Sequence, residues 1–306
     1  MKQDIKLGDF NTLKMTEEAR RPDPHAYGGE EVFGIYLDGG IEGKILMPKK
    51  YVPEGVKVGN EVECFVYLDQ DERLVATTEK PLAKVGDFAY LECSWVNEYG
   101  AFLNWGLMKD VFCPFHEQKM RMEIGQSYIV YLYVDDDSFR IVASAKVDKY
   151  LKEHAAEARS LKQGQEVDLL VWQKTALGFK VIINNRLPGL VYANQVFRSL
   201  HTGDRTKGYI SNVREDGKID VTLQPTGRQL TESFSSQLLD YLKAHGGFCP
   251  FGDKSNADDI KRQFEVSKKT FKKAIGELYK KRLITLEDNG IRLCTEHQGM
   301  ADEGHS

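Results

Sequence analysis

The residues that are best placed for chemistry are aromatic and lie in "VNEYGAFLNWGLMKDVFCPFHEQ", residues 96–118, which includes Tyr99, Phe102, Phe112 and Phe115. Rings at this density either fill a small β core, since aromatics are common in strands, or form a platform on which another flat ring stacks. Residues three apart in a strand face opposite sides. We therefore expect a bulge at Gly100 to bring Tyr99 and Phe102 onto one face.

Two groups of cations follow further along the chain. Lys180 and Arg186 lie near Tyr192, a combination that suits phosphate groups and one stacked ring; an ordinary solvated face is an equal alternative. The second group shares a predicted helix, on which residues three and four apart are neighbours. Its members are Lys268, Lys269, Lys272 and Lys273. A solubilising lysine face or a protein-docking surface is the alternative there.

Signals for catalysis and for metal binding are absent from the sequence. The seven histidines form no H-x-x-x-H or H-x-H pair, and the five cysteines have no C-x-x-C spacing. "GGFCPFGDKS", residues 246–255, has the wrong spacing for a phosphate-binding loop and follows a predicted helix where that motif follows a strand. We expect no catalytic residue, no metal, no cofactor and no small-molecule substrate.

The composition is that of a globular cytoplasmic protein. The chain has 306 residues, of which 41% are hydrophobic and 29% charged. No apolar run approaches the ~20 residues of a membrane span, so we expect no membrane partner. The net charge of −4 hides an asymmetry. Residues 1–83 carry −5 and residues 84–148 carry −4, whereas residues 161–226 carry +3 and residues 234–293 carry +4.

Three segments of the chain share landmarks in one register. They begin alike at Gly8, Gly86 and Gly164, which are 78 residues apart. A later glycine recurs at the same place in each copy, at Gly34, Gly100 and Gly178. The first copy has twelve extra residues, within the polar stretch "RRPDPHAYGG", which we expect to form an exposed loop. The pattern indicates a triplicated domain of about 70 residues.

Each copy is predicted to form a small barrel. In the second copy, "FAYLECSWV", "AFLNW", "VFCPF", "YIVYLYV" and "RIVAS" are β-branched or aromatic runs between polar turns. Five short strands in so few residues fit a closed barrel. Together with "EYGAF" and "DVFCPFHE", the second copy resembles the OB-fold module named after ribosomal protein S-one. The usual histidine of that module's third strand is replaced here by Pro48, Pro114 and Tyr192.

The C-terminal quarter has a different pattern. Residues 235–245 have helical spacing, Ser255 is a candidate helix cap, and "KKTFKKAIGELYKKRLI" places Phe271 and Ile275 on one face. "ITLEDNGIRL" predicts a hairpin that turns at Asn289-Gly290. This order is typical of a winged helix. Three S-one-type modules followed by a winged helix resemble the conserved virulence factor B family of bacterial RNA-binding regulators.

The predicted fold is therefore mainly β, with three tandem five-stranded OB barrels and a C-terminal α+β winged-helix domain. The expected parts are barrels at residues 1–82, 83–148 and 161–226, a helical linker at 149–160, a winged helix at 234–293 and a flexible tail at 294–306.

The resemblance implies a non-enzymatic regulator that binds single-stranded or structured RNA, with the ribosome or other proteins as further partners. OB folds stack bases on the sheet face that holds Tyr99 and Phe102. Two alternatives stay open. One is a protein-interaction scaffold in which only the C-terminal half contacts nucleic acid, and the other is a winged-helix DNA-binding transcription regulator.

Overall fold

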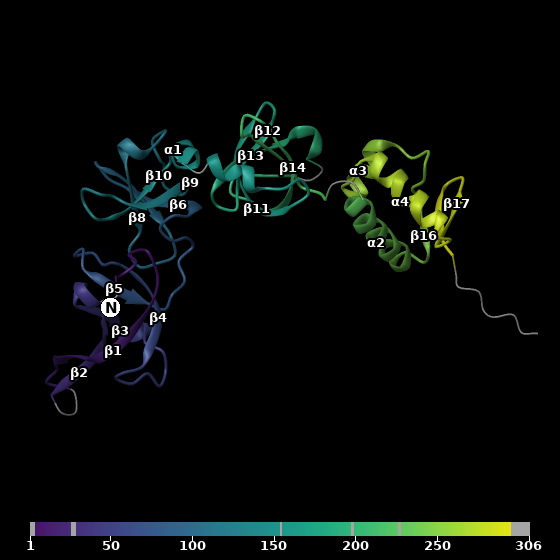
Figure 1. Cartoon of the computed structure of the whole chain (residues 1–306). Coiled ribbons are helices and arrows are strands. Elements are labelled where there is room, and N and C mark those ends of the chain that lie inside the picture. The colour runs from purple at the N-terminus through teal and green to yellow at the C-terminus, as the bar shows by residue number, and fades with distance from the viewer. Residues whose placement is uncertain (1–3, 26–28, 154, 197–198, 226–227, 295–306) are drawn as a thin grey trace, which may run out of the picture. The chain divides into compact units, whose positions relative to one another are not determined.

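The structure is a computed structural model that describes residues 4–25, 29–153, 155–196, 199–225 and 228–294. The chain divides into two compact units, one of residues 1–155 with 185–187 and one of the remaining residues. Closed five-stranded barrels come first along the chain, and a helical domain with a small sheet follows (Figure 1). The predicted class, mainly β with closed barrels and a winged helix, is confirmed.

Each barrel is closed in the same cyclic order of strands: first, second, third, fifth, fourth. The first barrel consists of β1 (Asp9–Pro22), β2 (Glu30–Asp38), β3 (Lys44–Pro48), β4 (Glu61–Leu68) and β5 (Leu74–Thr77). The second consists of β6 (Phe88–Val96), β7 (Gly100–Asn104), β8 (Val111–Pro114), β9 (Ser127–Val134) and β10 (Ile141–Ser144). The third consists of β11 (Glu166–Thr175), β12 (Gly178–Ile183), β13 (Leu187–Tyr192), β14 (Arg205–Val213) and β15 (Ile219–Thr222). The third and fifth strands of each barrel run parallel.

The glycine that recurs in each copy lies where the second strand passes close to the third. A Cβ atom at Gly100 would lie 2.4 Å from the carbonyl oxygen of Cys113, and one at Gly178 would lie 2.1 Å from that of Val191. Any side chain at these positions would push the two strands apart. The glycine is therefore required for close backbone approach.

A β-bulge does occur in each barrel, but in the neighbouring first strand and opposite residues two to three positions after this glycine. The register shifts between Met15 and Glu17 in β1, between Cys93 and Trp95 in β6, and between Val171 and Gln173 in β11. The bulge predicted at Gly100 was therefore placed on the wrong strand. Its recurrence at one position in all three barrels marks it as part of their common architecture.

The polar stretch of the first copy is exposed, as predicted, but its first residues, up to Pro22, continue β1, and the described residues 23–25 and 29 form the turn beyond it. Strands β1 and β2 stay paired out to Pro22 and Glu30. Ion pairs join the two strands on the exposed side, with Arg20 3.6 Å from Glu30 and Arg21 2.7 Å from Glu31. The polar composition is explained by this solvated ribbon; residues 26–28 lie outside the described residues.

Two short helices follow the second barrel, α1 (Val147–Glu153) and the 3-10 helix η4 (Ala155–Ser160). Helix α1 packs against strand β9, because the buried ring of Tyr150 stacks on that of Tyr131 with centroids 4.1 Å apart. The helix therefore begins slightly before the predicted linker and is attached to the second barrel.

The C-terminal domain has three helices and a three-stranded sheet. Its elements are α2 (Arg228–Ala244), β16 (Phe248–Cys249), α3 (Ala257–Phe264), α4 (Lys268–Lys280), β17 (Ile284–Glu287) and β18 (Gly290–Leu293), with the sheet in the order β16-β18-β17. The predicted apolar face of α4 is confirmed, since Phe271 and Ile275 are buried in the core with Phe234 and Leu238 of α2.

Three local predictions for this domain need correction. Asn256 caps α3 by accepting a hydrogen bond from the backbone N–H of Asp258, 2.8 Å away, while Ser255 accepts from Gly252. The hairpin turns one residue earlier than predicted, because Glu287 pairs directly with Gly290. Strand β16 was not predicted, because two residues are too short to show a period.

Within the described part of the chain, none of the helices has both the length and the apolar character needed to cross a bilayer. Those same residues contain no group of three or more His, Cys, Asp or Glu side chains arranged to hold a metal ion. Apart from Cys294, the predicted tail at residues 294–306 lies outside the described residues.

Candidate nucleic-acid interface

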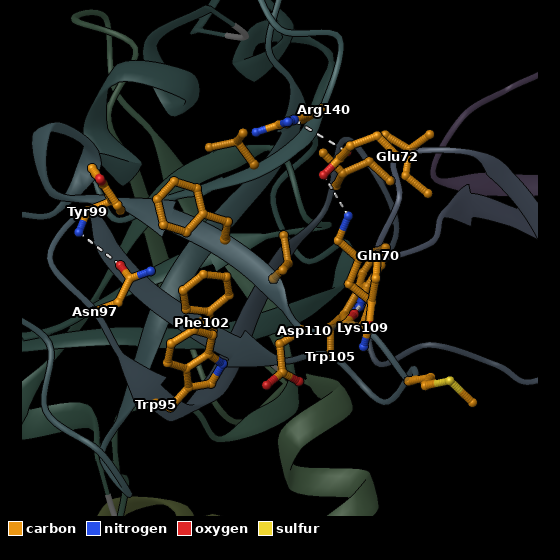
Figure 2. A pocket seen from close by; sticks show the side chains of 16 residues that line it. Gln70, Glu72, Trp95, Asn97, Tyr99, Phe102, Trp105, Lys109, Asp110 and Arg140 are labelled. Atoms are coloured by element: carbon orange, nitrogen blue, oxygen red, sulfur yellow. Dashed lines mark hydrogen bonds and ion pairs between the residues drawn. The ribbon is translucent and has the colours of Figure 1, made fainter.

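The second barrel carries a column of aromatic rings on its outer surface. Trp95 of β6, Phe102 of β7 and Phe112 of β8 occupy paired positions on three adjacent strands. The rings of Trp95 and Phe102 are parallel, with centroids 4.0 Å apart and an angle of 6° between their planes. Phe112 lies 5.0 Å from Phe102 at 42°. Figure 2 shows the face-to-face pair of Trp95 and Phe102.

Trp95 is the functional candidate that sequence reasoning missed, and the bulge explains why. Leu91 and Cys93 face the core with at most 1% exposure, so strict alternation would bury Trp95 as well. The register shift between Cys93 and Trp95 turns the indole outward, where it is 46% exposed. The sequence of a single strand does not show where a bulge lies. Alternation from Leu91 and Cys93 therefore predicts that Trp95 belongs to the core.

The two predicted stacking residues of this barrel both line the same pocket. Tyr99 is 66% exposed and lies in the turn before β7, so its ring reaches the pocket from the turn. Its backbone is held on both sides: its N–H donates to Asn97 Oδ1 at 2.9 Å, and its carbonyl accepts from the N–H of Phe115 at 3.1 Å. Phe102 is half-buried between Trp95 and Phe112. The open ring surface therefore belongs mainly to Trp95 and Tyr99.

The pocket has a volume of about 720 Å³ and draws on both barrels of the first unit. The second barrel supplies the aromatic column and its surroundings. The first barrel supplies Leu68, Gln70 and Glu72, from the end of β4 and the turn that leads to β5. A cavity of this size is in the range of natural ligand sites.

A shared apolar core holds the two barrels together beneath the pocket. The ring of Trp105, only 2% exposed, packs edge-on against Phe65 at 5.7 Å and Tyr67 at 6.3 Å, both on β4 of the first barrel. Its indole N–H donates to the carbonyl of Lys109 at 2.7 Å. Burial, with smaller effects from nearby acidic groups, raises the pKa of Tyr67 to about 12. The wall from the first barrel is therefore a fixed part of the pocket.

The third barrel has a different surface at the equivalent positions. Gln173 pairs with Lys180 there, as Trp95 pairs with Phe102 in the second barrel. The ammonium group of Lys180 lies 4.9 Å from the ring centroid of Trp172, a cation–π contact. At these positions the third barrel therefore has a cation in contact with an indole instead of a column of rings.

The three predicted residues of the third barrel are not brought together as one site. Arg186 is exposed in the turn between β12 and β13, whereas Tyr192 ends β13 at the opposite end of that hairpin. The hydroxyl of Tyr192 accepts a hydrogen bond from Arg214, which is also bonded to Asp220 at 2.8 Å. The Tyr192 ring is thus anchored by its own barrel.

At the positions equivalent to Trp95 and Phe102, the first barrel has an acidic residue and a single ring. Glu17 pairs with Tyr36 across β1 and β2. Lys44 bridges them, with its ammonium 2.7 Å from the carboxylate of Glu17 and 5.8 Å from the ring of Tyr36. Tyr36 is therefore covered by a cation.

The predicted lysines of the winged helix lie on the outer side of α4. Lys269, Lys272 and Lys273 are exposed, whereas Lys268 is half-buried at the start of the helix. Lys272 forms an ion pair with Asp253 at 2.8 Å. Helix α4 contains no Asn, Gln or Arg, the side chains that commonly read base edges.

Comparison with known proteins agrees with this architecture. Residues 236–293 match the CvfB-like winged helix domain, and residues 29–79 match the S1 domain. The S1 match thus falls in the first barrel, although the motifs had indicated the second copy as the most typical. The chain is a multidomain protein with closed β-barrels, the first of which matches the S1 domain, and a CvfB-like winged helix domain.

Curated relatives extend over most of the chain. It is 28% identical over 264 residues to the uncharacterized protein YitL of Bacillus subtilis, covering 84% of this chain and 87% of that one. It is 23% identical over 252 residues to conserved virulence factor B of Staphylococcus saprophyticus, covering 81% and 84%. The resemblance to the conserved virulence factor B family is therefore confirmed.

A solved structure is also similar to the chain. A multidomain protein with nucleic acid binding domains from Streptococcus pneumoniae is 23% identical, covers 94% of this chain and 98% of that one, and has a TM-score of 0.42.

Proposed function

We propose that this protein is a non-catalytic cytoplasmic regulator that binds RNA, and that its three barrels are tandem OB folds of the S-one type. The shared cyclic order of strands supports this assignment for every barrel. One observation carries the function: the second barrel presents the Trp95–Phe102–Phe112 column, with Tyr99 beside it, in an open pocket.

The pocket suits bases that are free of a duplex. Stacking of a base on an aromatic side chain contributes ~1–3 kcal/mol and tolerates any base, since every base has a flat face. In a duplex these faces are already occupied by neighbouring base pairs. A single strand or an unpaired loop of RNA offers them directly, and RNA is mostly recognised in this form.

The basic C-terminal half supports the same function through charge. Residues 161–293 carry a net charge of +7, and Lys180, Lys269 and Lys273 are among the cations at their surface. Contacts of lysine with phosphate carry no sequence information. We therefore assign α4 a role in holding the nucleic acid backbone, which favours RNA regulation over sequence-specific DNA binding.

The test is a pair of matched substitutions on strand β6 of the full chain. Trp95→Ala removes the open face of the column, whereas Tyr90→Ala removes an aromatic side chain of similar exposure, 41%, that does not line the pocket. Binding of an unstructured RNA of about 12 nucleotides is measured by fluorescence anisotropy. We expect Trp95→Ala to weaken binding about 5- to 150-fold, which corresponds to one stack, and Tyr90→Ala to have little effect.

A control with duplex RNA completes the design. Loss of affinity in Trp95→Ala should be confined to the single strand, since a duplex has no free base to stack. Unchanged single-strand binding by a folded Trp95→Ala variant would rule out the proposed platform. Equal losses for both variants would show that the effect is not specific to the pocket.

A further inference from the structure

Both cations that line the aromatic pocket are already paired, and with the same carboxylate. Glu72 of the first barrel lies 3.0 Å from the ammonium group of Lys109 and 3.3 Å from the guanidinium of Arg140, both of the second barrel. Figure 2 shows Glu72 between these two side chains. The charges that would attract a phosphate group are therefore occupied from within the protein.

Glu72 is presented by a turn that is itself well ordered. It has a positive φ of 61° between β4 and β5. The carboxylate of Asp69 accepts hydrogen bonds from the backbone N–H groups of Asp71 at 2.9 Å and Arg73 at 3.0 Å. Lys109 also donates to the carbonyl of Asp69 at 2.7 Å. The hydrogen bonds of the turn thus hold the backbone of Glu72 beside both cations.

The pocket consequently has balanced charges. Its charged lining residues are two acidic ones, Glu72 and Asp110, and two basic ones, Lys109 and Arg140. A phosphate group that approaches Lys109 or Arg140 here is repelled by the carboxylate of Glu72, which already neutralises part of their charge. An uncharged flat ring gains the full stacking surface with no such repulsion.

We propose that Glu72 is a specificity-determining residue, which competes with phosphate for Lys109 and Arg140 and so makes the pocket select unstacked bases over general polyanions. This inference rests on the proposed function of the pocket. It assigns the first barrel a direct part in recognition by the second. It also explains how a segment with a net charge of −9, residues 1–148, can bind nucleic acid selectively.

Removal of the Glu72 charge is not expected to separate the barrels. The apolar contact of Trp105 with Phe65 and Tyr67 joins them independently of this ion pair. Glu72, Lys109 and Arg140 are 35%, 29% and 57% exposed, and ion pairs of such exposure contribute little to stability. Glu72→Gln is isosteric and removes the negative charge that neutralises both cations.

The experiment compares Glu72→Gln with Glu63→Gln in the full chain. Glu63 is exposed on β4 and does not line the pocket, so its substitution changes the net charge equally. Binding of duplex RNA and of an unstructured single strand is measured between about 50 and 200 mM salt, a range over which each phosphate contact changes affinity about threefold. We expect Glu72→Gln to bind the duplex up to about tenfold more tightly at the low end, with a salt slope steeper by between about one and two.

A double-mutant cycle of Glu72→Gln with Arg140→Gln identifies which cation causes the gain in duplex RNA affinity. In the parent chain Arg140 is occupied, so Arg140→Gln should change duplex binding little. In the Glu72→Gln background the same substitution should remove about half of the gain, because one of two freed cations is lost. The gain should persist when Trp95→Ala is added, since duplex binding does not use the platform.

Four other outcomes would refute the proposed role of Glu72. Duplex binding and salt slope equal to those of Glu63→Gln, or weaker RNA binding with a clearly lowered melting temperature, would overturn the competition and make Glu72 a structural residue. If Trp95→Ala leaves single-strand binding intact, the proposed function fails and this inference fails with it. If Trp95→Ala weakens binding while Glu72→Gln changes nothing, only the inference is refuted. Tighter binding of an acidic peptide by Glu72→Gln, without a gain for duplex RNA, would indicate a protein ligand and also refute it.

Discussion

Substitution of Trp105 by alanine tests whether the first two barrels act as one unit. The indole is 2% exposed and fills the space between the barrels, where it contacts Phe65 and Tyr67. Loss of a buried Trp costs about 3–5 kcal/mol. This cost already includes the loss of the two edge-on aromatic contacts and of the hydrogen bond to Lys109. We therefore expect a decrease of about 4 kcal/mol in the free energy of unfolding of the first unit.

Differential scanning calorimetry of the full chain measures this effect. For a unit of this size, 1 kcal/mol corresponds to about 2–4 °C, so the transition should fall by roughly 10 °C. Trp95→Ala is the matched control: its indole is 46% exposed, and the loss should stay below about 1.5 kcal/mol. Trp105→Ala should also weaken RNA binding, because the wall with Gln70 and Glu72 moves. A transition shifted by no more than the control would refute the interpretation that this core couples the barrels.

Three further outcomes follow from individual contacts. Gly100→Ala would place a Cβ atom 2.4 Å from the carbonyl oxygen of Cys113, and we expect it to destabilise the barrel by about 1–3 kcal/mol in chemical denaturation. Burial raises the pKa of Tyr67 to about 12, so the stability gained from keeping its hydroxyl protonated is complete below the ordinary tyrosine pKa and is lost as pH rises through 12. An absorbance titration should show one tyrosine that ionises late, and ionisation of Tyr67 at the ordinary tyrosine pKa would contradict its burial. Lys269→Gln with Lys273→Gln should lower the salt slope of RNA binding by about one to two without changing the preference for single strands, and an unchanged slope would exclude this face.

The fold was largely predictable because a triplicated sequence repeats its own constraints. The glycine at positions 34, 100 and 178 recurs because each copy brings its second and third strands to the same close approach. The apolar face of α4 was predictable from helical spacing, since one stripe of a packed helix must be buried. These features depend on local geometry, which a single sequence shows through residue type and spacing.

The candidate site was only partly predictable, because it depends on two features that alternation does not show. The bulge in β6 turns Trp95 to the surface, against the period of the strand. The pocket wall comes from a turn of the preceding barrel, whose approach is set by the buried Trp105. Tyr99 and Phe102 were found because they flank a conspicuous glycine. Glu72 had no signal of its own, as an acidic residue in a polar turn.

The distribution of charge and rings separates two binding modes along the chain. The first unit is acidic, pairs its pocket cations with Glu72 and offers exposed rings, so on the proposed function it discriminates by stacking and depends weakly on salt. On the same proposal, residues 161–293, with a net charge of +7 and Lys180 in place of Phe102, contribute an attraction to phosphate that is strong at low salt and independent of sequence. Because both modes are carried by one chain, binding through the basic half raises the effective concentration of RNA at the aromatic pocket. The overall charge of −4 therefore does not argue against a polyanionic ligand, because it averages an acidic part with a basic one.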